Sequence, residues 1–467
     1  MVSHAGSALL GQVADKSGLT KALSRGLSSI RQRRGGHDPG HVIRDLAVML
    51  ADGGEALSDL GAVREQAPLF GAVASDSTAY RLIDQVASAP ELLDALRAAH
   101  GFHPLLAYFD EPDEAAAAKL RPGNAGANTA ADQIEVSEAA LEQIPAELVA
   151  EIGVLLRVDS AGASHELLDW AHEGNIRFSV GYSLSEAVRS AIEALPESAW
   201  SAAQSQDGTE RPNGEVAEIT DLLDLGSWPE GSRLIVRRER PHPGAQLSFT
   251  DHDGHRFQAI LTDQAGEIAA IERRHRHRAR VEDQIKDDKD TGLAKLPFRD
   301  FQMNAVWLEL VGLAHNLISW TKSLLLRGEL ARSQPQRLRP RLLHVAGRLA
   351  FSGRRAKLRL QASWPWAGEL AAAFARLQAY RRRPAEPGSA APRQLDPPPA
   401  APRQTKPAHG WSRPRWSGPR RPTRRHLQPR IGAHHRPRCQ PAADAYLTRL
   451  AARSGLGVRP GLAPPPK

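Results

Sequence analysis

Residues 152–182, IGVLLRVDSAGASHELLDWAHEGNIRFSVGY, contain the pattern that decides the fold. Two short apolar runs, VLLRV and IRFSV, flank the segment HELLDWA, whose apolar residues recur at helical spacing. Short apolar runs bounded by turn residues are typical of buried strands, and strands that alternate with helices form a sheet covered on both faces. We therefore predict an α/β fold, with the carboxylate of Asp159 at the end of the first strand.

The α/β pattern continues on both sides of this segment. Residues 101–185 also contain the apolar run GFHPLLAYFD, which predicts a strand, and the periodic segment NTAADQIEVSEAALEQI, which predicts a helix. Residues 186–272 are more β-like, as in RLIVRRERP, and include the pair Asp253-Gly254, which is typical of hairpin turns. We predict an α/β core over the first range and an inserted, β-rich subdomain over the second.

The N-terminal part, residues 1–100, predicts a small helical domain, because segments such as HVIRDLAVMLA and STAYRLIDQVA carry apolar residues three and four positions apart. Ser75 is suited to cap a helix at its start. The exposed face of that helix would carry Thr78, Tyr80 and Arg81, as in a helix-turn-helix that recognises DNA. A capped helix in an ordinary bundle explains the same pattern equally well.

Charge and composition divide the rest of the chain. Residues 273–380 predict a further helical region, whereas residues 381–467 are rich in Pro and Arg and predict a disordered tail. The tail holds 19 Lys and Arg against three acidic residues, a net charge of +16, so the total of +8 leaves the preceding part with −8.

The single cysteine, Cys439, excludes a disulfide framework and favours a reducing cytoplasm, and we expect neither secretion nor membrane insertion.

The segment RRHRHRARVEDQIKDDKDTGL carries the most specific spacing. His275, Arg278, Glu282 and Lys289 follow one another at intervals of three, four and seven residues. Residues at such intervals share one face of a helix. A solvated helix laced with ion pairs would show the same pattern, but the apolar segment FQMNAVWLELVGLAHNLISW that follows predicts a buried helix that fixes the position of this stripe.

The spacing of Arg278, Glu282 and Lys289 matches a signature of many bacterial insertion-sequence transposases, in which a Tyr precedes the Arg by three residues. Here that position is His275. The segments LRPGNAGANTAADQI, LLRVDSAGASHELLDW, VRRERPHPGAQL and KDTGLAKLPF also resemble transposases of the insertion sequence 1380 family. The resemblance extends over most of residues 1–370.

The resemblance implies a DDE-type transposase with an RNase-H-like core, in which three carboxylates hold two Mg²⁺ (or Mn²⁺) ions. By position, Asp159 would be the second carboxylate and Glu282 the third. Arg278, Lys289 and His275 would support the site or contact DNA phosphates. Such metals suit phosphodiester hydrolysis and strand transfer. The implied partner is double-stranded DNA, both the inverted-repeat ends of the element and its target, bound by a homodimer.

The resemblance breaks where the first catalytic Asp is expected. In the family this Asp lies on a strand that precedes the segment resembling GFHPLLAYFD, and there is no room for that strand between His100 and Gly101. We therefore expect that the first, central strand is missing through an internal deletion and that DNA transposition is defective. Asp110 is a replacement ligand only if the strands re-pair. The alternatives are a catalytically dead DNA-binding remnant and a remnant that does not fold.

Overall fold

The computed structural model describes residues 2–30, 36–89, 92, 105–121, 129–241, 251–252, 254–352 and 355–380. These all belong to one compact unit of the chain. The Pro/Arg-rich tail, the junction at His100 and Gly101, and Asp253 lie outside the described residues, so the predictions made for them stay predictions.

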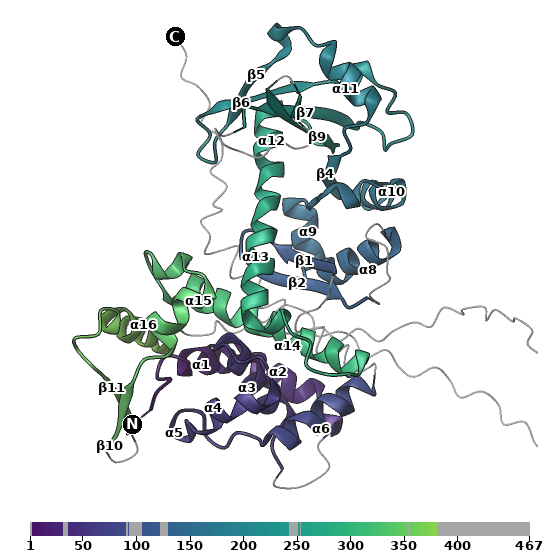
Figure 1. Cartoon of the computed structure of the whole chain (residues 1–467). Helices are drawn as coiled ribbons and strands as arrows, with labels where there is room; N and C mark the ends of the chain where they lie inside the picture. The colour runs from purple at the N-terminus through teal and green to yellow at the C-terminus, as the bar shows by residue number, and fades with distance from the viewer. Residues whose placement is uncertain are drawn as a thin grey trace, which may run out of the picture. The chain divides into compact units, whose positions relative to one another are not determined.

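The largest apolar core joins helices from both ends of the described chain. Helix α14 (Phe301–Trp320) is buried on almost every side, and α3 (Pro39–Ala51) and α6 (Asp76–Ala87) pack against it (Figure 1). Trp307 and Trp320 are buried in it, as their place on an apolar helix predicts. None of the described helices is long and apolar enough to cross a membrane. The other helices of this core are α1 (Ala8–Ser17), α2 (Leu19–Gly26), α4 (Leu60–Arg64), α5 (Ala67–Phe70), α15 (Pro335–Leu338) and α16 (Ala367–Ala379).

A mixed sheet forms the second part of the fold. Its strand order is β3-β4-β9-β7-β6-β5, with β8 paired to β9. The parallel pair β3 and β4 is connected by α10 (His165–Glu173), which confirms the strand-helix-strand prediction, and the later strands extend the same sheet in antiparallel pairs. The strands are β3 (Leu155–Val158), β4 (Arg177–Tyr182), β5 (Ser201–Gln204), β6 (Glu210–Glu218), β7 (Arg233–Glu239), β8 (Asp251–His252) and β9 (His255–Thr262), and α11 (Glu186–Glu193) follows β4.

The first two strands form a separate hairpin. Among the strands that the structure describes, β1 (Leu105–Phe109) pairs only with β2 (Glu114–Lys119), and α8 (Ala130–Leu141) covers the hairpin. Another helix, α9 (Ala146–Ile152), precedes β3. Within the described ranges, no strand lies between this hairpin and β3 in a common sheet.

One prediction for the C-terminal part is wrong. The range 273–380 was expected to be helical throughout, but β10 (Gly347–Ser352) and β11 (Arg355–Leu360) form an antiparallel hairpin within it. The physical reason is the alternation in RAKLRL, residues 355–360, where basic and apolar residues occupy successive positions. That period of two fits a strand, not a helix.

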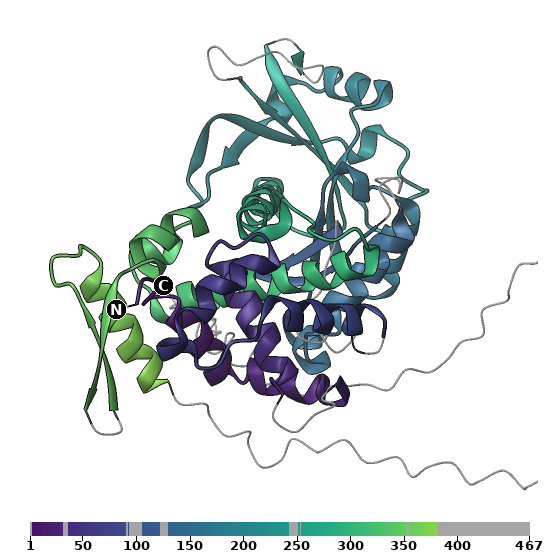
Figure 2. The same cartoon turned by 60° about the horizontal axis from the view of Figure 1, so that its bottom comes forward.

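A nearly continuous helix connects the sheet to the helical core. It consists of α12 (Ile268–Arg276), a single 3-10 turn and α13 (Arg280–Asp288), and Figure 2 shows it strongly foreshortened. The π-turn η7 (Lys289–Leu293) ends it at Gly292, whose φ is +104°. A Cβ at this glycine would lie 2.7 Å from Leu50, so only glycine fits this bend beside α3.

Candidate active site

Helix α12 is anchored to the mixed sheet by buried polar side chains. Glu272 is 1% exposed and accepts a hydrogen bond of 3.0 Å from Arg237 of β7. One turn further, His275 Nδ1 lies 2.9 Å from Ser179 Oγ of β4. Burial and the positive charge of Arg278 lower the pKa of His275 to about 4, so the imidazole is neutral at pH 7. His275 therefore joins α12 to β4 without carrying a charge that attracts phosphate.

Apart from His275, the polar stripe predicted for this helix is partly or fully exposed. Arg278 Nη2 donates to Glu282 Oε1 at 3.1 Å, and the Glu282 side chain is 68% exposed. Lys289 is exposed as well, at the start of η7. The contact between Arg278 and Glu282 agrees with their predicted common face. An exposed ion pair of this kind contributes little stability, so the stripe is available to a ligand.

Asp159 lies at the end of β3, as predicted. Its exposed carboxylate caps the single turn that follows and accepts a hydrogen bond of 3.0 Å from the backbone N–H of Ala161. This turn packs closely on β4, because a Cβ at Gly181 would lie 3.0 Å from the backbone nitrogen of Ser160. The position of Asp159 is thus fixed by the backbone, and a capping role already accounts for the carboxylate.

Asp110, the replacement ligand considered above, is held by two cations. Its carboxylate lies 2.6 Å from Arg157 of β3 and 3.1 Å from Arg280 of α13. Arg157 also donates to the backbone carbonyl of Arg274 at 2.8 Å. Asp110 therefore links the β1–β2 hairpin to β3 and to the connecting helix through ion pairs.

These carboxylates do not form a ready magnesium site. Mg²⁺ requires oxygen ligands in near-octahedral geometry. Among the residues that the structure describes, Asp110, Asp159 and Glu282 belong to no group of three His, Cys, Asp or Glu side chains whose ligand atoms lie within 4.8 Å of one another. The residues present do not fit the two-metal centre that the resemblance implies, and we derive no catalytic step through it.

The predicted recognition face lies on α6. Ser75 caps this helix by accepting from the N–H of Thr78 at 3.3 Å, as the sequence predicts. Tyr80 is 47% exposed and its ring meets that of Phe298 edge to face. Arg81 is exposed, but it donates to the carbonyl of Ser77 at 2.9 Å and so folds back on its own helix.

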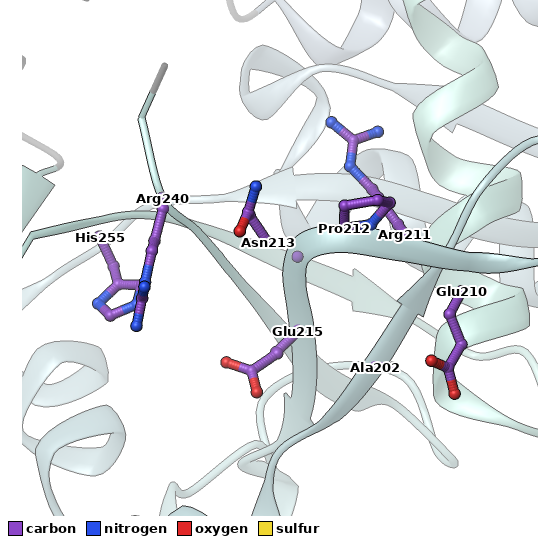
Figure 3. A pocket seen from close by; sticks show the side chains of 9 residues that line it. Ala202, Glu210, Arg211, Pro212, Asn213, Glu215, Arg240 and His255 are labelled. Atoms are coloured by element: carbon purple, nitrogen blue, oxygen red, sulfur yellow. The ribbon is translucent and has the colours of Figure 1, made fainter. Parts of the chain in front are cut away.

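A pocket of about 480 Å³ lies over β5, β6 and the start of β9 (Figure 3). Arg240 and His255 lie toward one side of it in Figure 3, whereas Glu210 lies toward the other. Glu215 between them is bonded to Arg238 at 2.7 Å. Because the charged groups are spread out and of mixed sign, the pocket offers no set of side chains that converges on a reacting atom.

A buried polar network attaches the β1–β2 hairpin to α13 and α14. Asp288 accepts from the Tyr108 hydroxyl at 2.6 Å, and its other oxygen lies 2.7 Å from His315 Nδ1. Gln284, one turn before Asp288, donates to the Asp113 carboxylate at 3.0 Å. Burial lowers the pKa of His315, but the charge and the hydrogen bond of Asp288, together with the charge of Asp113, outweigh it and raise the pKa to about 9. The histidine is therefore protonated and paired.

Two further side chains of α14 bind the hairpin. Asn316 accepts from the N–H of Ala115 at 2.8 Å and donates to the carbonyl of the same residue at 3.0 Å. Trp320 donates to Glu114 at 2.8 Å, and burial raises the pKa of that carboxyl to about 7. Sequence reasoning missed this network. The available signal was the presence of polar residues within an otherwise apolar helix, where a buried polar group needs a partner.

The comparisons with known proteins agree with this architecture. Residues 90–382 match the family model described as "Transposase DDE domain group 1", which is more than half of the chain. No curated protein matches. The chain therefore belongs to the DDE-domain transposases, whose domains generally use divalent metal ions.

Proposed function

We propose that this chain is a defective insertion-sequence transposase of the 1380 family that binds DNA. In this proposal an internal deletion has removed the first, central strand of an RNase-H-like core together with the first catalytic Asp. The observation that carries it is the separation of the β1–β2 hairpin from β3, each in its own sheet within the described ranges.

The contacts between the two sheets support this proposal. In an intact sheet a strand between the hairpin and β3 would join them through backbone hydrogen bonds. Here the ion pair between Asp110 and Arg157, at 2.6 Å, joins them instead. The guanidinium of Arg157 thus neutralises Asp110, the carboxylate that directly follows β1.

The remaining catalytic residues would be Asp159 and Glu282, with Mg²⁺ or Mn²⁺ as the cofactor. Two exposed carboxylates without a third supply too few oxygen ligands for a pair of metal ions. We propose that Arg278 and Lys289 contact the DNA backbone beside them, because the Arg278 side chain is 28% exposed and Lys289 is exposed.

The DNA-binding part of the proposal rests on two surfaces. The first is the exposed face of α6, with Thr78, Tyr80 and Arg81 as recognition residues. The second is one face of the β10–β11 hairpin. Because a transposase brings two element ends together, we propose that a homodimer binds them.

The β10–β11 hairpin has a basic face that lacks acidic partners. Arg348 lies opposite Arg359 in the strand register, and Lys357 is the next residue along the same face. All three are exposed, and among the described residues none of them forms an ion pair. Like charges directly opposite each other destabilise a hairpin. A phosphate backbone would remove this repulsion, and a two-stranded ribbon fits a DNA groove.

Binding and cleavage can be separated in one experiment. The purified chain is incubated with a labelled duplex carrying the inverted-repeat ends of its element, with Mg²⁺ or Mn²⁺, beside the Asp159→Ala, Glu282→Ala double variant. We expect both proteins to bind and neither to nick. Nicking by the parent chain that the double variant loses would overturn the proposed defect and make Asp110 the leading replacement ligand.

Adding back the missing strand tests the deletion directly. We would insert, between His100 and Gly101, the corresponding segment of an intact relative. We expect metal-dependent nicking to appear and to disappear again with Asp159→Ala or Glu282→Ala. A soluble, folded insertion variant that binds DNA but never nicks it would contradict the assignment of these two residues.

The basic hairpin is tested by Arg348→Gln combined with Arg359→Gln. We expect DNA affinity to fall by about tenfold at low salt and the salt dependence to become shallower. Arg189→Gln on α11 is the matched control, because it removes one exposed arginine far from the hairpin in the sequence. Equal affinities for all three proteins would remove the hairpin from the DNA surface.

A further inference from the structure

Three distant segments of the chain bring two histidines and one aspartate together. His4 belongs to the N-terminal segment, Asp52 follows the end of α3, and His344 follows the turn η10 (Arg339–Leu343). Figure 1 shows the N-terminus beside β10 and β11. The metal-binding atoms of these three side chains lie within 4.8 Å of one another, the one such group among the described residues.

We propose that His4, Asp52 and His344 bind a divalent transition-metal ion of the Zn²⁺ type. His4 Nδ1 contacts one carboxylate oxygen of Asp52, and His344 Nε2 lies 3.1 Å from the other. In a tetrahedral zinc site the bonds are about 2.0–2.2 Å long, which places ligand atoms roughly 3–3.6 Å apart. An ion of this kind would replace the hydrogen bond between His4 Nδ1 and the Asp52 carboxylate, and that of His344 Nε2, which lies 2.9 Å from the backbone carbonyl of Asp52.

The three ligands are held by a rigid backbone. The N-terminal segment pairs with the segment after η10 through Val2 N–H to the Gly347 carbonyl at 2.9 Å and Ala5 N–H to the Val345 carbonyl at 2.9 Å. A Cβ at Gly6 would lie 1.8 Å from a backbone oxygen of η10, so the two segments are in direct contact. Little reorganisation is therefore needed to bind an ion, which favours affinity.

The site is centred on a buried carboxylate and is partly open. Asp52 is 8% exposed, and its ion-pair partners among the described residues are His4 and His344. The guanidinium of Arg339, which donates to the carbonyl of Ala51 at 3.0 Å, is the nearby cation with which a bound ion would compete for Asp52. Ser7 Oγ donates to its carboxylate at 2.5 Å and so orients it, as groups behind a metal ligand commonly do. The side chains of His4 and His344 are 24% and 36% exposed, which gives an ion access and leaves room for a water as fourth ligand.

The donor set distinguishes this site from the one that DDE chemistry requires. Imidazole nitrogens with one carboxylate favour Zn²⁺ or a related transition metal, whereas Mg²⁺ prefers oxygen ligands alone. A bound ion would tie the N-terminal segment and the base of the β10–β11 hairpin to α3. Its role would be to stabilise the helical core, independently of any catalytic metal.

Calorimetric titration of the chelator-treated full chain with Zn²⁺ tests the proposal. We expect one equivalent to bind, and His4→Gln and His344→Gln each to weaken binding by at least about tenfold. His172→Gln, which removes an exposed histidine at the end of α10, should leave it unchanged. No stoichiometric binding by the parent chain, or equal loss in the control variant, would overturn the proposal.

A second measurement needs no variant. Zn²⁺ should protect His4 and His344 of the parent chain from diethyl pyrocarbonate while His172 stays reactive, as read by mass spectrometry. Mg²⁺ at the same concentration should protect neither. Equal modification of both site histidines with and without Zn²⁺ would contradict the site even if the substituted variants fail to fold.

Discussion

The two faces of α13 carry carboxylates in opposite environments, one buried and the other exposed to solvent. On the face toward α14, Asp288 is 2% exposed and bonded to Tyr108 and His315. On the other face, Glu282 is exposed, and among the described residues its carboxylate contacts only Arg278. The first face attaches the β1–β2 hairpin to the helical core, and the second presents polar groups to solvent. The buried contacts of Asp288 therefore hold α13 in place, and the position of Glu282 on this helix does not depend on its own carboxylate.

The largest contrast should appear when each carboxylate is removed. Asp288→Ala leaves a buried, protonated His315 without its partner, and we expect the free energy of unfolding to fall by about 3–5 kcal/mol. Glu282→Ala should change it by less than about 0.5 kcal/mol. Urea unfolding followed by circular dichroism measures both. Similar losses in the two variants would show that the two faces do not differ as described.

The pH dependence of the unfolding free energy tests the buried ion pair between His315 and Asp288. The pKa of His315 is about 9 in the folded protein, above its ordinary value of 6.5. The protonated imidazole therefore stabilises the fold fully below pH 6.5, and this contribution is lost as pH rises through 9. A shift of this size corresponds to about 3 kcal/mol at most. His315→Gln should flatten the decline of unfolding free energy between pH 6.5 and 9, and an unchanged slope would argue against the ion pair.

Replacing Asn316 tests whether the stability of the β1–β2 hairpin depends on its contacts with α14. Asn316→Ala leaves the backbone N–H and carbonyl of Ala115 without their side-chain partner, and we expect a loss of about 1–3 kcal/mol. Amide hydrogen exchange should become faster in β2. Gln361→Ala serves as the control and should leave β2 protected. It removes an exposed side-chain amide whose partner among the described residues is the nearby Ser363.

The smallest effect should come from the exposed pair itself. A double-mutant cycle of Arg278→Gln and Glu282→Gln should give a coupling energy of about 0.3–0.5 kcal/mol that decreases with added salt. Thermal unfolding at low and high ionic strength measures it. A coupling above about 1 kcal/mol would mean that Glu282 is a structural residue after all.

The elements that could be predicted from the sequence are those whose residues carry a local pattern. The strand-helix-strand around Asp159, the cap at Ser75 and the helix carrying Glu282 depend on spacings within a few residues. The network around Asp288 could not be predicted in this way, because its members come from segments up to 206 positions apart. The β10–β11 hairpin had a local signal in the alternation of RAKLRL in β11, which the prediction of a helical region over 273–380 leaves out.

The pairing of the first residues with the segment after η10 has a consequence for how the chain folds. Asp52 and His344 are 292 positions apart, and Lys16 donates to the carbonyl of Leu377 from 361 positions away. Contacts of such high contact order form slowly. During synthesis α1–α3 leave the ribosome long before α14, so their apolar faces remain uncovered while the α/β part is made. We expect the nascent chain to depend on chaperones for this period.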